Sequence, residues 1–545
     1  MNLRRYVSPK SWRRFIASRV EVMRRHRGDD ALDASWAARG PVKIEDGGDT
    51  LVADGLWFNP GYFLRLRLFI EAAARERPLR LLGLLRHRND WRQRRALERI
   101  GFREFVYLRD DEQFPIADFR PEAQRLMAGV RRHEDLLRIA LPGGVPPSVW
   151  YDSVLHKTRN GQPALDHPEW TESLAELLAY IAIYRRLLES RRVQCFALSH
   201  AWKNEWGAIL WLALHRGIDY YCVTQVSETI RIRRFRKPED FIRPVEHLTL
   251  GSFQLLAPTV QTALIQLGRI ELDRRYSCQT TDINIRYAFS PADRVTDRKA
   301  ARALLAGDTQ RPVGIIYGHS WFDYPHIYGM QNFVDFVDWF RTTIEQIRRL
   351  DHVTWLLKPH PMETWYGGLT MADMIGDLPE HIRVLPHKTD SLTAMAAADA
   401  IISVHGTAGI EAAASGVPVI CADRSYYDDW DIAHVAASRQ AYAELLGRVG
   451  RLPMPDAALR DRAAACFACA YGEPQGLSTA LRVPCDSLGS KLFVQVREIV
   501  ETAPADLAAE IDRIAEFRRQ DAVDSFVALA FVQAAARQAA QLRVA

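Results

Sequence analysis

Three polar stretches in the second half of the chain each follow an apolar run with the length of a strand. They are "YGHSWFDYPH" (Tyr317 to His326), "KPHP" (Lys358 to Pro361) and "HGTAG" (His405 to Gly409). Imidazole, amine and hydroxyl groups beside glycine can bind a phosphate and can help a leaving group depart. Ligands of open parallel sheets bind beyond the carboxyl ends of the strands, so we expect the three stretches to form one ligand site.

The stretch "KPHP" places His360 between Pro359 and Pro361, with Lys358 directly before them. A chain that only has to turn uses Gly, Asn or Asp, which tolerate turn geometry at little cost. Two prolines instead hold the backbone extended and rigid, which indicates that the imidazole is aimed. The alternatives are that the prolines form only a rigid turn and that Lys358 ends a strand in solvent.

The stretch "HGTAG" lies between the strand-like run "AIISV" and the helical run "IEAAAS". Gly406 and Gly409 allow close approach of the backbone, the free amides of a helix start favour an anion, and Thr407 adds a hydroxyl. Glu411 falls in the first helical turn, where its carboxylate could bind a ribose diol or simply favour the positive helix end. A capping box needs a spacing of three, whereas Thr407 and Glu411 are four apart. His405 could instead be a structural hydrogen-bonding residue.

Composition limits the class of protein. A chain of 545 residues predicts about two to four domains, and a net charge of +5 is too small for nucleic acid to be the expected ligand. Among seven cysteines only Cys466 and Cys469 are close in sequence, and we interpret them as buried thiols on a helix rather than metal ligands. No apolar run approaches the ~20 residues of a membrane span, and no secretory signal is recognised. We therefore expect a cytoplasmic protein.

Residues 1–28 are rich in arginine and contain a single acidic residue, Glu21. Apolar residues recur there at helical spacing, namely Trp12, Phe15, Ile16, Val20 and Met23. A basic amphipathic helix of this kind can lie on an anionic membrane surface, which would make the protein peripheral at the inner face of the cell membrane. The alternative, that the apolar stripe docks on the protein's own body, is equally compatible with the pattern.

Strand-like and helical runs alternate along both halves of the chain, which predicts parallel sheets with crossover helices. In the first half the expected strands are "TLVADG", "LRLLGLL", "REFVYL", "QCFALS" and "DYYCVT", and a long helix is expected from Glu169 to Arg191. In the second half they are "PVGIIY", "VTWLLK", "IRVLP", "AIISV" and "VPVICA". Each half is therefore predicted to be a doubly wound α/β domain, and the alanine-rich end, clearest from Glu510 to Val544, to be helical.

"KPHP" followed by "SVHGTAGIEAAASGVPVI" resembles the second domain of GT-B glycosyltransferases. The similar group is that of bacterial capsule and lipopolysaccharide biosynthesis, which includes Kdo transferases and, more distantly, sialyltransferases with a His-Pro motif. The resemblance covers about Gly314 to Asp423, and the first half matches only in its general pattern. It implies two Rossmann-like domains facing a cleft, with a terminal helix that crosses back to the first domain.

The resemblance implies domain limits and site roles. The expected segments are 1–45 (basic N-terminal segment), 46–300 (acceptor domain), 301–455 (donor domain) and 456–545 (helical segment packing back on the first domain).

In the family, the histidine of the His-Pro motif contacts the donor phosphate or assists the leaving group, a role that falls on His360. The loop that holds the donor phosphate corresponds to Ser403 through Gly409, and the acidic residue near the ribose to Glu411. The implied donor-binding residues are Lys358, Pro361, His319, Ser403, His405, Gly406, Thr407, Ala408, Gly409 and Glu411.

The acidic base that sialyltransferases carry in the first domain has no clear counterpart here. By loop position, the candidate bases are Asp54, Glu205, Glu228 and Asp323, of which we take Glu228 and Asp323, with His360, as the expected catalytic residues. A histidine with a pKa near neutral is suited to donate a hydrogen bond or a proton to the departing phosphate. The "DWD" at residues 429–431 is interpreted as a surface turn, and no metal site is expected.

The function expected from the resemblance is transfer of a sugar from a nucleotide-activated donor, CMP-Kdo-like or a UDP-sugar, to a growing capsule or lipopolysaccharide glycan. The nucleotide sugar is a co-substrate, and no other cofactor is expected. One alternative is an epimerase or hydrolase of nucleotide sugars with the same fold, which would need no acceptor. The other is a non-catalytic scaffold of a polysaccharide assembly complex.

Overall fold

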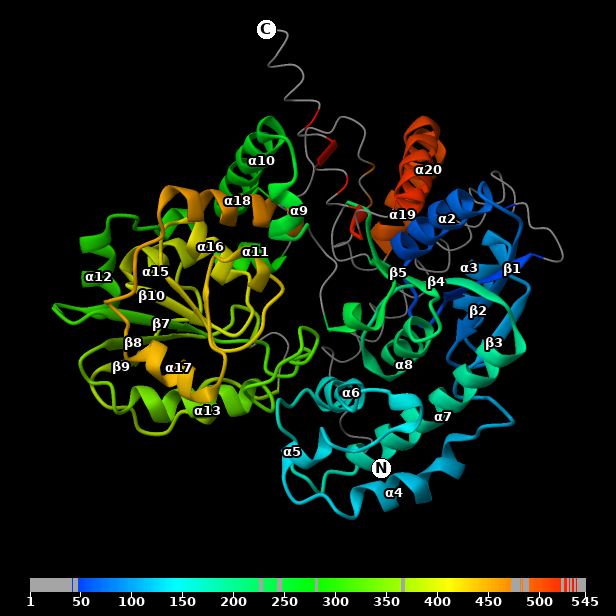
Figure 1. The fold of residues 1–545 in the computed structure, drawn as a ribbon, viewed down its shortest axis with the longest axis horizontal. Helices are drawn as coiled ribbons and strands as arrows, with labels where there is room; N and C mark the ends of the chain where they lie inside the picture. Colours follow the sequence, from blue (N-terminus) through cyan, green and yellow to red (C-terminus); the bar gives the residue numbers. More distant parts are fainter. Residues whose placement is uncertain are drawn as a thin grey trace, which may run out of the picture.

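The computed structural model forms two lobes, each built on a six-stranded sheet (Figure 1). It describes residues 42, 48–224, 229–242, 248–279, 283–363, 368–471, 481, 483, 490–520 and scattered positions from 524 to 536. The predicted helix within residues 1–28 and the candidate Glu228 lie outside the described residues. We call the lobe that starts with residue 48 the first lobe and the lobe that starts with residue 248 the second lobe.

The first-lobe sheet has the order β3-β2-β1-β4-β5-β6, and all neighbours are parallel except β5 and β6. Its strands are β1 (Asp49–Asp54), β2 (Leu79–Leu85), β3 (Glu104–Tyr107), β4 (Val193–Leu198), β5 (Asp219–Thr224) and β6 (Arg231–Phe235). The first five coincide with the predicted apolar runs, because strands of a parallel sheet are buried on both faces. β6, with the sequence "RIRRF", is not among the predicted strands.

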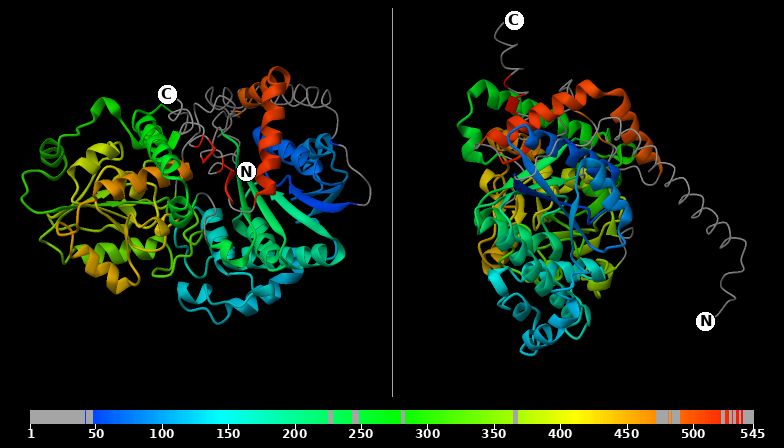
Figure 2. Two further views of the ribbon diagram at one scale, coloured as in Figure 1. Left: turned by 45° about the horizontal axis from the view of Figure 1, so that its top comes forward. Right: turned by 90° about the vertical axis from the view of Figure 1, so that its right-hand side faces the viewer.

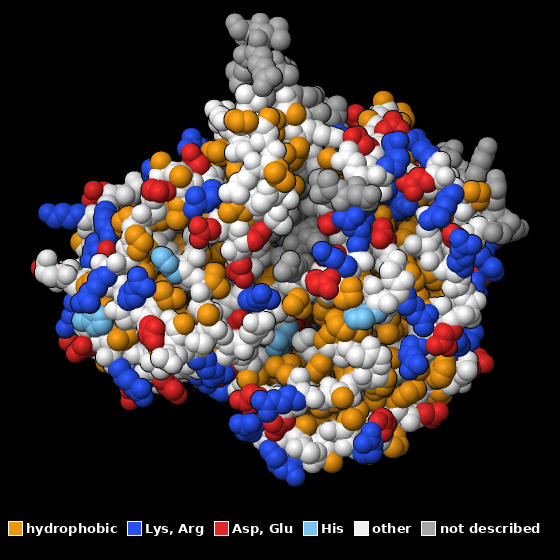
Figure 3. All heavy atoms as spheres, viewed as in Figure 1, with side chains coloured by type: hydrophobic (Ala, Val, Ile, Leu, Met, Phe, Trp, Pro, Cys, Tyr) orange, Lys and Arg blue, Asp and Glu red, His pale blue; other side chains and the backbone are white. Residues whose placement is uncertain are grey.

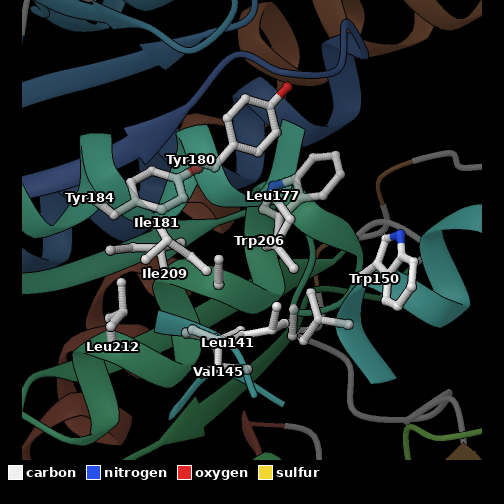
Figure 4. Packing of buried hydrophobic residues seen from close by; sticks show 14 of the residues in the cluster. Leu141, Val145, Trp150, Leu177, Tyr180, Ile181, Tyr184, Trp206, Ile209 and Leu212 are labelled. Atoms are coloured by element: carbon white, nitrogen blue, oxygen red, sulfur yellow. The ribbon is translucent and has the colours of Figure 1, made fainter. Parts of the chain in front are cut away.

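Helices cover both faces of this sheet. They are α2 (Pro60–Ala74), α3 (Trp91–Ile100), α4 (Arg120–Met127), α5 (His133–Leu136), α6 (Ser148–Thr158), α7 (Glu169–Ser190) and α8 (Lys203–Leu214). Alternate residues of β1 point to opposite faces: Val52 joins the core formed with α6, α7 and α8, whereas Leu51 joins the core formed with α2 and α3. Figure 4 shows the first of these cores, where Leu177 of α7 and Ile209 of α8 contribute to the packing.

The second-lobe sheet has the order β12-β11-β10-β7-β8-β9 and is parallel throughout. Its strands are β7 (Val313–Tyr317), β8 (Thr354–Lys358), β9 (Ile382–Val384), β10 (Ala400–Ser403), β11 (Val419–Cys421) and β12 (His434–Val435). All but the two-residue β12 were expected from the sequence. The order reverses between β7 and β10, so the loops that follow these two strands diverge at a topological switch point, the usual ligand position in such sheets.

The second lobe includes helices that precede its first strand in the sequence as well as helices that lie between or after its strands. They are α9 (Leu250–Gln254), α10 (Pro258–Tyr276), α11 (Ile283–Ala288), α12 (Arg298–Ala306), α13 (Phe336–Ile347), α15 (Ser391–Ala397), α16 (Ala408–Ala414), α17 (Arg439–Leu446) and α18 (Ala457–Tyr471). Leu248, Phe253 and Leu264 are buried in the same core as Ile315 of β7. The expected domain boundary at residue 300 therefore falls inside the second lobe.

Two further helices, α19 (Ser490–Thr502) and α20 (Pro504–Arg519), return to the first lobe. Figures 1 and 2 both show α20 beside α2, and Leu507 and Phe517 of α20 share a core with Phe69 of α2. The expected crossing back is therefore present from residue 490, whereas α18 packs on the second lobe. A continuous helix from Glu510 to Val544 is not formed, because the backbone becomes extended at Gln520.

Among the helices that the structure describes, none combines the length and the apolar character that crossing a membrane demands.

Candidate functional site

The structure brings the three loops of the second lobe together at the carboxyl ends of β7, β8 and β10. The amide of Gly318, directly after β7, donates to the carbonyl of Lys358 at 2.9 Å. His319 Nε2 lies 3.4 Å from Ser403 Oγ, and the rings of His319 and His405 are 5.1 Å apart. The expectation that these loops meet at one sheet edge is therefore confirmed by geometry.

Aromatic rings hold His319 and His405 in place. The ring of Phe336 stacks on His319 with a centroid distance of 4.4 Å, and Tyr328 lies edge-on to His405 at 4.8 Å. Burial lowers the pKa of His405 to about 3, with the charge of His326 adding to the effect, and burial also lowers the pKa of His319. Nδ1 of His405 is buried and has no hydrogen-bond partner among the described residues, so this ring nitrogen could form a hydrogen bond with a ligand.

His360 has a defined tautomer. The amide of Met362 donates to Nδ1 at 3.3 Å, so we infer that the ring proton is on Nε2, which can then donate to an anion. Burial lowers the pKa of His360 to about 4, and the neighbouring charge of Lys358 adds to the shift. The expectation of a pKa near neutral is therefore wrong. The imidazole is neutral and acts first as a hydrogen-bond donor.

Lys358 is buried, with 1% of its surface exposed, and no carboxylate pairs with it in the described part of the chain. Its Nζ lies 5.4 Å from the centre of the Tyr317 ring. Burial lowers the pKa of Lys358 to about 8, although the more distant carboxylates of Asp390 and Glu411 partly oppose this shift. Asp390 already accepts from the amides of Ser290 and Thr393, so Lys358 is a cation held in the interior without an anion of its own.

Glu411 lies in the first turn of α16, as expected, but its carboxylate is already engaged. Arg275 of α10 forms an ion pair with it, and the hydroxyl of Tyr276 donates to the Glu411 carbonyl at 3.3 Å. Glu411 itself is 4% exposed. A ribose diol would therefore have to share this carboxylate with Arg275, and the ribose contact stays a prediction.

The two glycines of the "HGTAG" loop have different surroundings. Gly406 donates from its amide to Ser403 Oγ at 3.2 Å, and a side chain there would point toward Ser403 and His319. A side chain at Gly409 would overlap the hydroxyl of Tyr427, and the Gly409 amide already donates to the Gly406 carbonyl at 3.0 Å. Gly409 is therefore required by packing inside the lobe, while Gly406 borders the site. Thr407 and Ala408 lie between them, half-buried at the start of α16.

Only one of the described candidate bases is open to solvent. Asp323 is exposed, yet protein atoms crowd around it and raise its pKa to about 6, with Lys203 opposing and Asp152 adding to the rise. Glu205 is buried and pairs with Arg86 at 2.8 Å. Asp54 is fully buried at the end of β1. Asp323 is therefore the carboxylate best placed to meet a substrate among these three.

The two lobes contact each other directly beside these loops. Nδ1 of His326 lies 2.6 Å from Oδ1 of Asp152 on α6, and the hydroxyl of Tyr151 donates to Oδ2 of Asp335 at 2.6 Å. A small recess lies between the lobes, lined on the first-lobe side by residues that include Asp152 and 201–203 and on the second-lobe side by His326 and Ile327. Figure 3 shows the surface hollowed where the lobes meet, with basic and acidic side chains around the hollow.

Sequence reasoning missed the first-lobe residues that lie in or near this recess. The ring of His156 on α6 stacks on Tyr324 at 5.3 Å, and Lys203 extends its Nζ to 5.7 Å from the same ring. Lys203 adopts φ +71°, a left-handed backbone that costs energy for any residue but glycine. A sequence signal for these residues exists, because "HAWK" directly follows the expected strand "QCFALS". The rule that ligands bind beyond the carboxyl ends of strands, which was applied to the second sheet, would have identified this stretch.

The remaining sequence motifs take structural places. Asp429 and Asp431 are exposed on a turn that the buried Trp430 anchors. Cys466 and Cys469 are buried thiols on α18, as interpreted from the sequence. Over the described ranges, no three His, Cys, Asp or Glu side chains gather closely enough to hold a metal ion.

No protein-family model and no curated protein sequence matches the chain. Among solved structures it is similar to the beta Kdo 2,4 transferase KpsC of Thermosulfurimonas dismutans, with 14% identity, 50% of this chain and 79% of that chain covered, and a TM-score of 0.34. It is also similar to MurG of Acinetobacter baumannii (12% identity, 78% and 96% covered, TM-score 0.23). A third similar structure is the UDP-GlcNAc 2-epimerase of Neisseria meningitidis bound to UDP-GlcNAc (9% identity, 77% and 94% covered, TM-score 0.22). The two-lobe architecture is established by the strand orders of the two sheets.

Proposed function

We propose that this protein is a GT-B-type glycosyltransferase that moves a sugar from a nucleotide-activated donor to a glycan acceptor. The observation that carries the proposal is the buried, unpaired Lys358 beside three neutral histidines at the switch point of the second sheet. An interior cation without its own anion is costly, and a bound phosphate would offset that cost. The donor phosphate is therefore the ligand that this edge fits best.

The chemistry follows from where negative charge grows. When the bond between the anomeric carbon and the phosphate oxygen breaks, the phosphate keeps the electron pair. Lys358 supplies a positive charge near it, and His360 donates a hydrogen bond from Nε2. Such donors act most strongly in a site closed to water, because the low dielectric strengthens each interaction. Lys358 and the histidines thereby take the part that a divalent metal has in other transferases.

The finer assignments remain part of the proposal. The donor is CMP-Kdo-like or a UDP-sugar, and the acceptor is a growing capsule or lipopolysaccharide glycan that enters through the interlobe recess. Asp323 stays a predicted catalytic residue, since a carboxyl with a pKa of about 6 can bind and release a proton near neutral pH. Contact of residues 1–28 with an anionic membrane surface also stays a prediction.

A thermal-shift comparison with CMP, UDP, GDP and CDP tests the proposal. A ligand at about a hundred times its dissociation constant adds roughly 2.7 kcal/mol of stability, which is easily measured. We expect one of the four to stabilise the wild-type protein and not the Lys358→Met variant. The nucleotide sugar that corresponds to it is then incubated alone: an epimerised sugar would indicate an isomerase, and stabilisation by none of the four would contradict the proposal.

A further inference from the structure

A chain of hydrogen bonds runs from Asp54 to His200 at the switch point of the first sheet, between the ends of β1 and β4. Oδ2 of Asp54 accepts from the Ser199 hydroxyl at 2.9 Å, from the Ser199 amide at 3.1 Å and from the indole of Trp206. Nδ1 of His200 lies 2.9 Å from Ser199 Oγ. Because the single hydroxyl proton of Ser199 is given to Asp54, Ser199 Oγ must accept from His200 Nδ1–H. The Nε2 of His200 therefore carries a lone pair.

The His200 ring is held rigidly but is not sealed off. The rings of Trp57 and Trp206 lie 5.6 and 4.7 Å from it, and the hydroxyl of Tyr220 donates to the His200 carbonyl. His200 remains partly exposed, and its Nε2 has no hydrogen-bond partner in the part of the chain that the structure describes. Asp54 and Ser199 are both buried. Burying a carboxyl group costs free energy, and here the buried Asp54 orients one partly exposed imidazole. Such an arrangement indicates a functional role for the imidazole.

The position of His200 fits a task in the recess. The three residues that follow it, Ala201 to Lys203, line the recess opposite His326 of the second lobe. The charged and titratable groups that act on the ring are Lys203 at the start of α8 and His156 on α6, besides Asp54 through Ser199. His200 thus directly precedes the first-lobe lining of a recess whose second-lobe lining, His326 and Ile327, belongs to the loop that follows β7.

We propose that His200 is the general base of the transfer reaction and that Ser199 and Asp54 are its positioning residues. This inference rests on the proposed function, because it concerns the acceptor in the same reaction. The acceptor hydroxyl gives its proton to His200 Nε2 while its oxygen forms the new bond to the anomeric carbon. The bond from that carbon to the phosphate oxygen breaks, and the phosphate takes the electron pair. The imidazolium then releases the proton to water.

The charge state of His200 sets the pH dependence expected of this step. Burial lowers its pKa to about 3, and Lys203 and His156 add to the shift, so the ring is unprotonated across the physiological pH range. A base that is free at all these pH values gives no loss of rate in mild acid. Asp323, with a pKa of about 6, would instead give a rate that falls as pH drops through 6.

The experiment compares His200→Gln and His200→Ala with wild type in two assays. Binding of CMP, UDP, GDP and CDP is measured by calorimetry, and nucleotide release is measured with the nucleotide sugar of whichever one binds, with water as acceptor. We expect unchanged nucleotide affinity and a release rate lower by about 10²- to 10⁴-fold. Added imidazole should restore part of the rate of His200→Ala but none of any loss in His156→Ala, a second histidine close to Lys203.

The positioning residues give a second readout. Ser199→Ala should lower kcat without raising KM, and Ser199→Thr, which keeps the hydroxyl, should recover much of the loss. Release by His200→Gln at the wild-type rate would overturn the base assignment while leaving nucleotide binding, and hence the proposed function, intact. An acid limb near pH 6 that disappears in Asp323→Asn would likewise overturn it and assign the base to Asp323. Failure of wild type to bind any of the four nucleotides would instead refute the proposed function.

Discussion

Nδ1 of His326 lies 2.6 Å from Oδ1 of Asp152, and this buried contact joins the two lobes. The amide of His326 also donates to Oδ2 of the same carboxylate, at 3.2 Å. Burial by itself would lower the pKa of His326, but the Asp152 carboxylate outweighs it and raises the pKa above the ordinary value. The pair therefore links closure of the lobes to protonation of one imidazole.

Asp152→Asn should destabilise the protein in a pH-dependent manner. The raised pKa means that the pair contributes fully below the ordinary imidazole pKa of about 6.5 and that this contribution fades as pH rises through the folded-state value. Breaking a buried pair costs about 3 kcal/mol or more. Chemical denaturation at a series of pH values measures the difference from wild type. A difference between Asp152→Asn and wild type that stays constant with pH would contradict the linkage.

Lys358→Met should stabilise the protein and abolish nucleotide binding. The pKa of about 8, against 10.5 for a free lysine, corresponds to about 3 kcal/mol of unfavourable charge burial in the folded protein. Since the folded pKa is the lower one, the gain should be complete below pH 8 and shrink as pH rises toward 10.5. Denaturation with and without UDP or CMP measures both effects. Lys388→Met, at an exposed lysine, should change neither, and a less stable Lys358→Met protein would count against an unpaired charge.

Gly406→Val should prevent nucleotide binding and leave the fold intact. The first carbon of a side chain there would lie 3.0 Å from Ser403 Oγ and 3.7 Å from the His319 ring, so valine would fill the space between the loops. Gly409→Ala is the matched control, because its methyl group would collide with Tyr427 inside the lobe. It should lower stability by about 1–3 kcal/mol. Calorimetry and thermal unfolding together separate the two outcomes; tight binding by a folded Gly406→Val protein would remove this loop from the donor site.

His360→Ala should bind nucleotide nearly normally and transfer sugar about 10²- to 10⁴-fold more slowly, because its contribution grows as the phosphate departs. Glu411→Gln should mainly weaken binding. It also weakens the ion pair with Arg275, so its stability has to be measured beside its affinity. The measurements are calorimetric affinity and product formation at saturating donor. A near-normal rate for His360→Ala would mean that Pro359 and Pro361 only shape a turn.

The sequence predicted both central sheets because buried parallel strands are apolar on both faces, as in "LRLLGLL" of β2. It failed at β6, where arginines occupy a strand. Arg234 of β6 is buried because its guanidinium donates to the carbonyls of Arg518 and Gln520, far along the chain. A strand whose polar side chains are satisfied by a distant segment has no local pattern to reveal it. The misplaced boundary at residue 300 has the same origin, since burial of Leu264 against the second sheet is also a long-range contact.

The candidate site shows the same limit. Residue types and the strand-end rule placed His319, His360 and His405 at one edge, which depends only on topology. The charge state of His360 depends on burial, and the availability of Glu411 depends on Arg275, which comes from a helix outside the sheet. The Asp54–Ser199–His200 chain joins the ends of two strands whose adjacency the sequence does not state. Partners that are distant in sequence decide which predicted residues remain free to act.

The return of α20 to the first lobe has a consequence for the order in which the chain can fold. The second lobe is continuous from residue 248 to 471 and can close its cores as soon as that stretch has left the ribosome. The first lobe is made earlier but cannot finish, because Phe69 of α2 lacks Leu507 and Phe517 until the last helix emerges. During synthesis the apolar face of α2 therefore stays uncovered for the time needed to make the whole second lobe. The half that is translated first is the half that matures last.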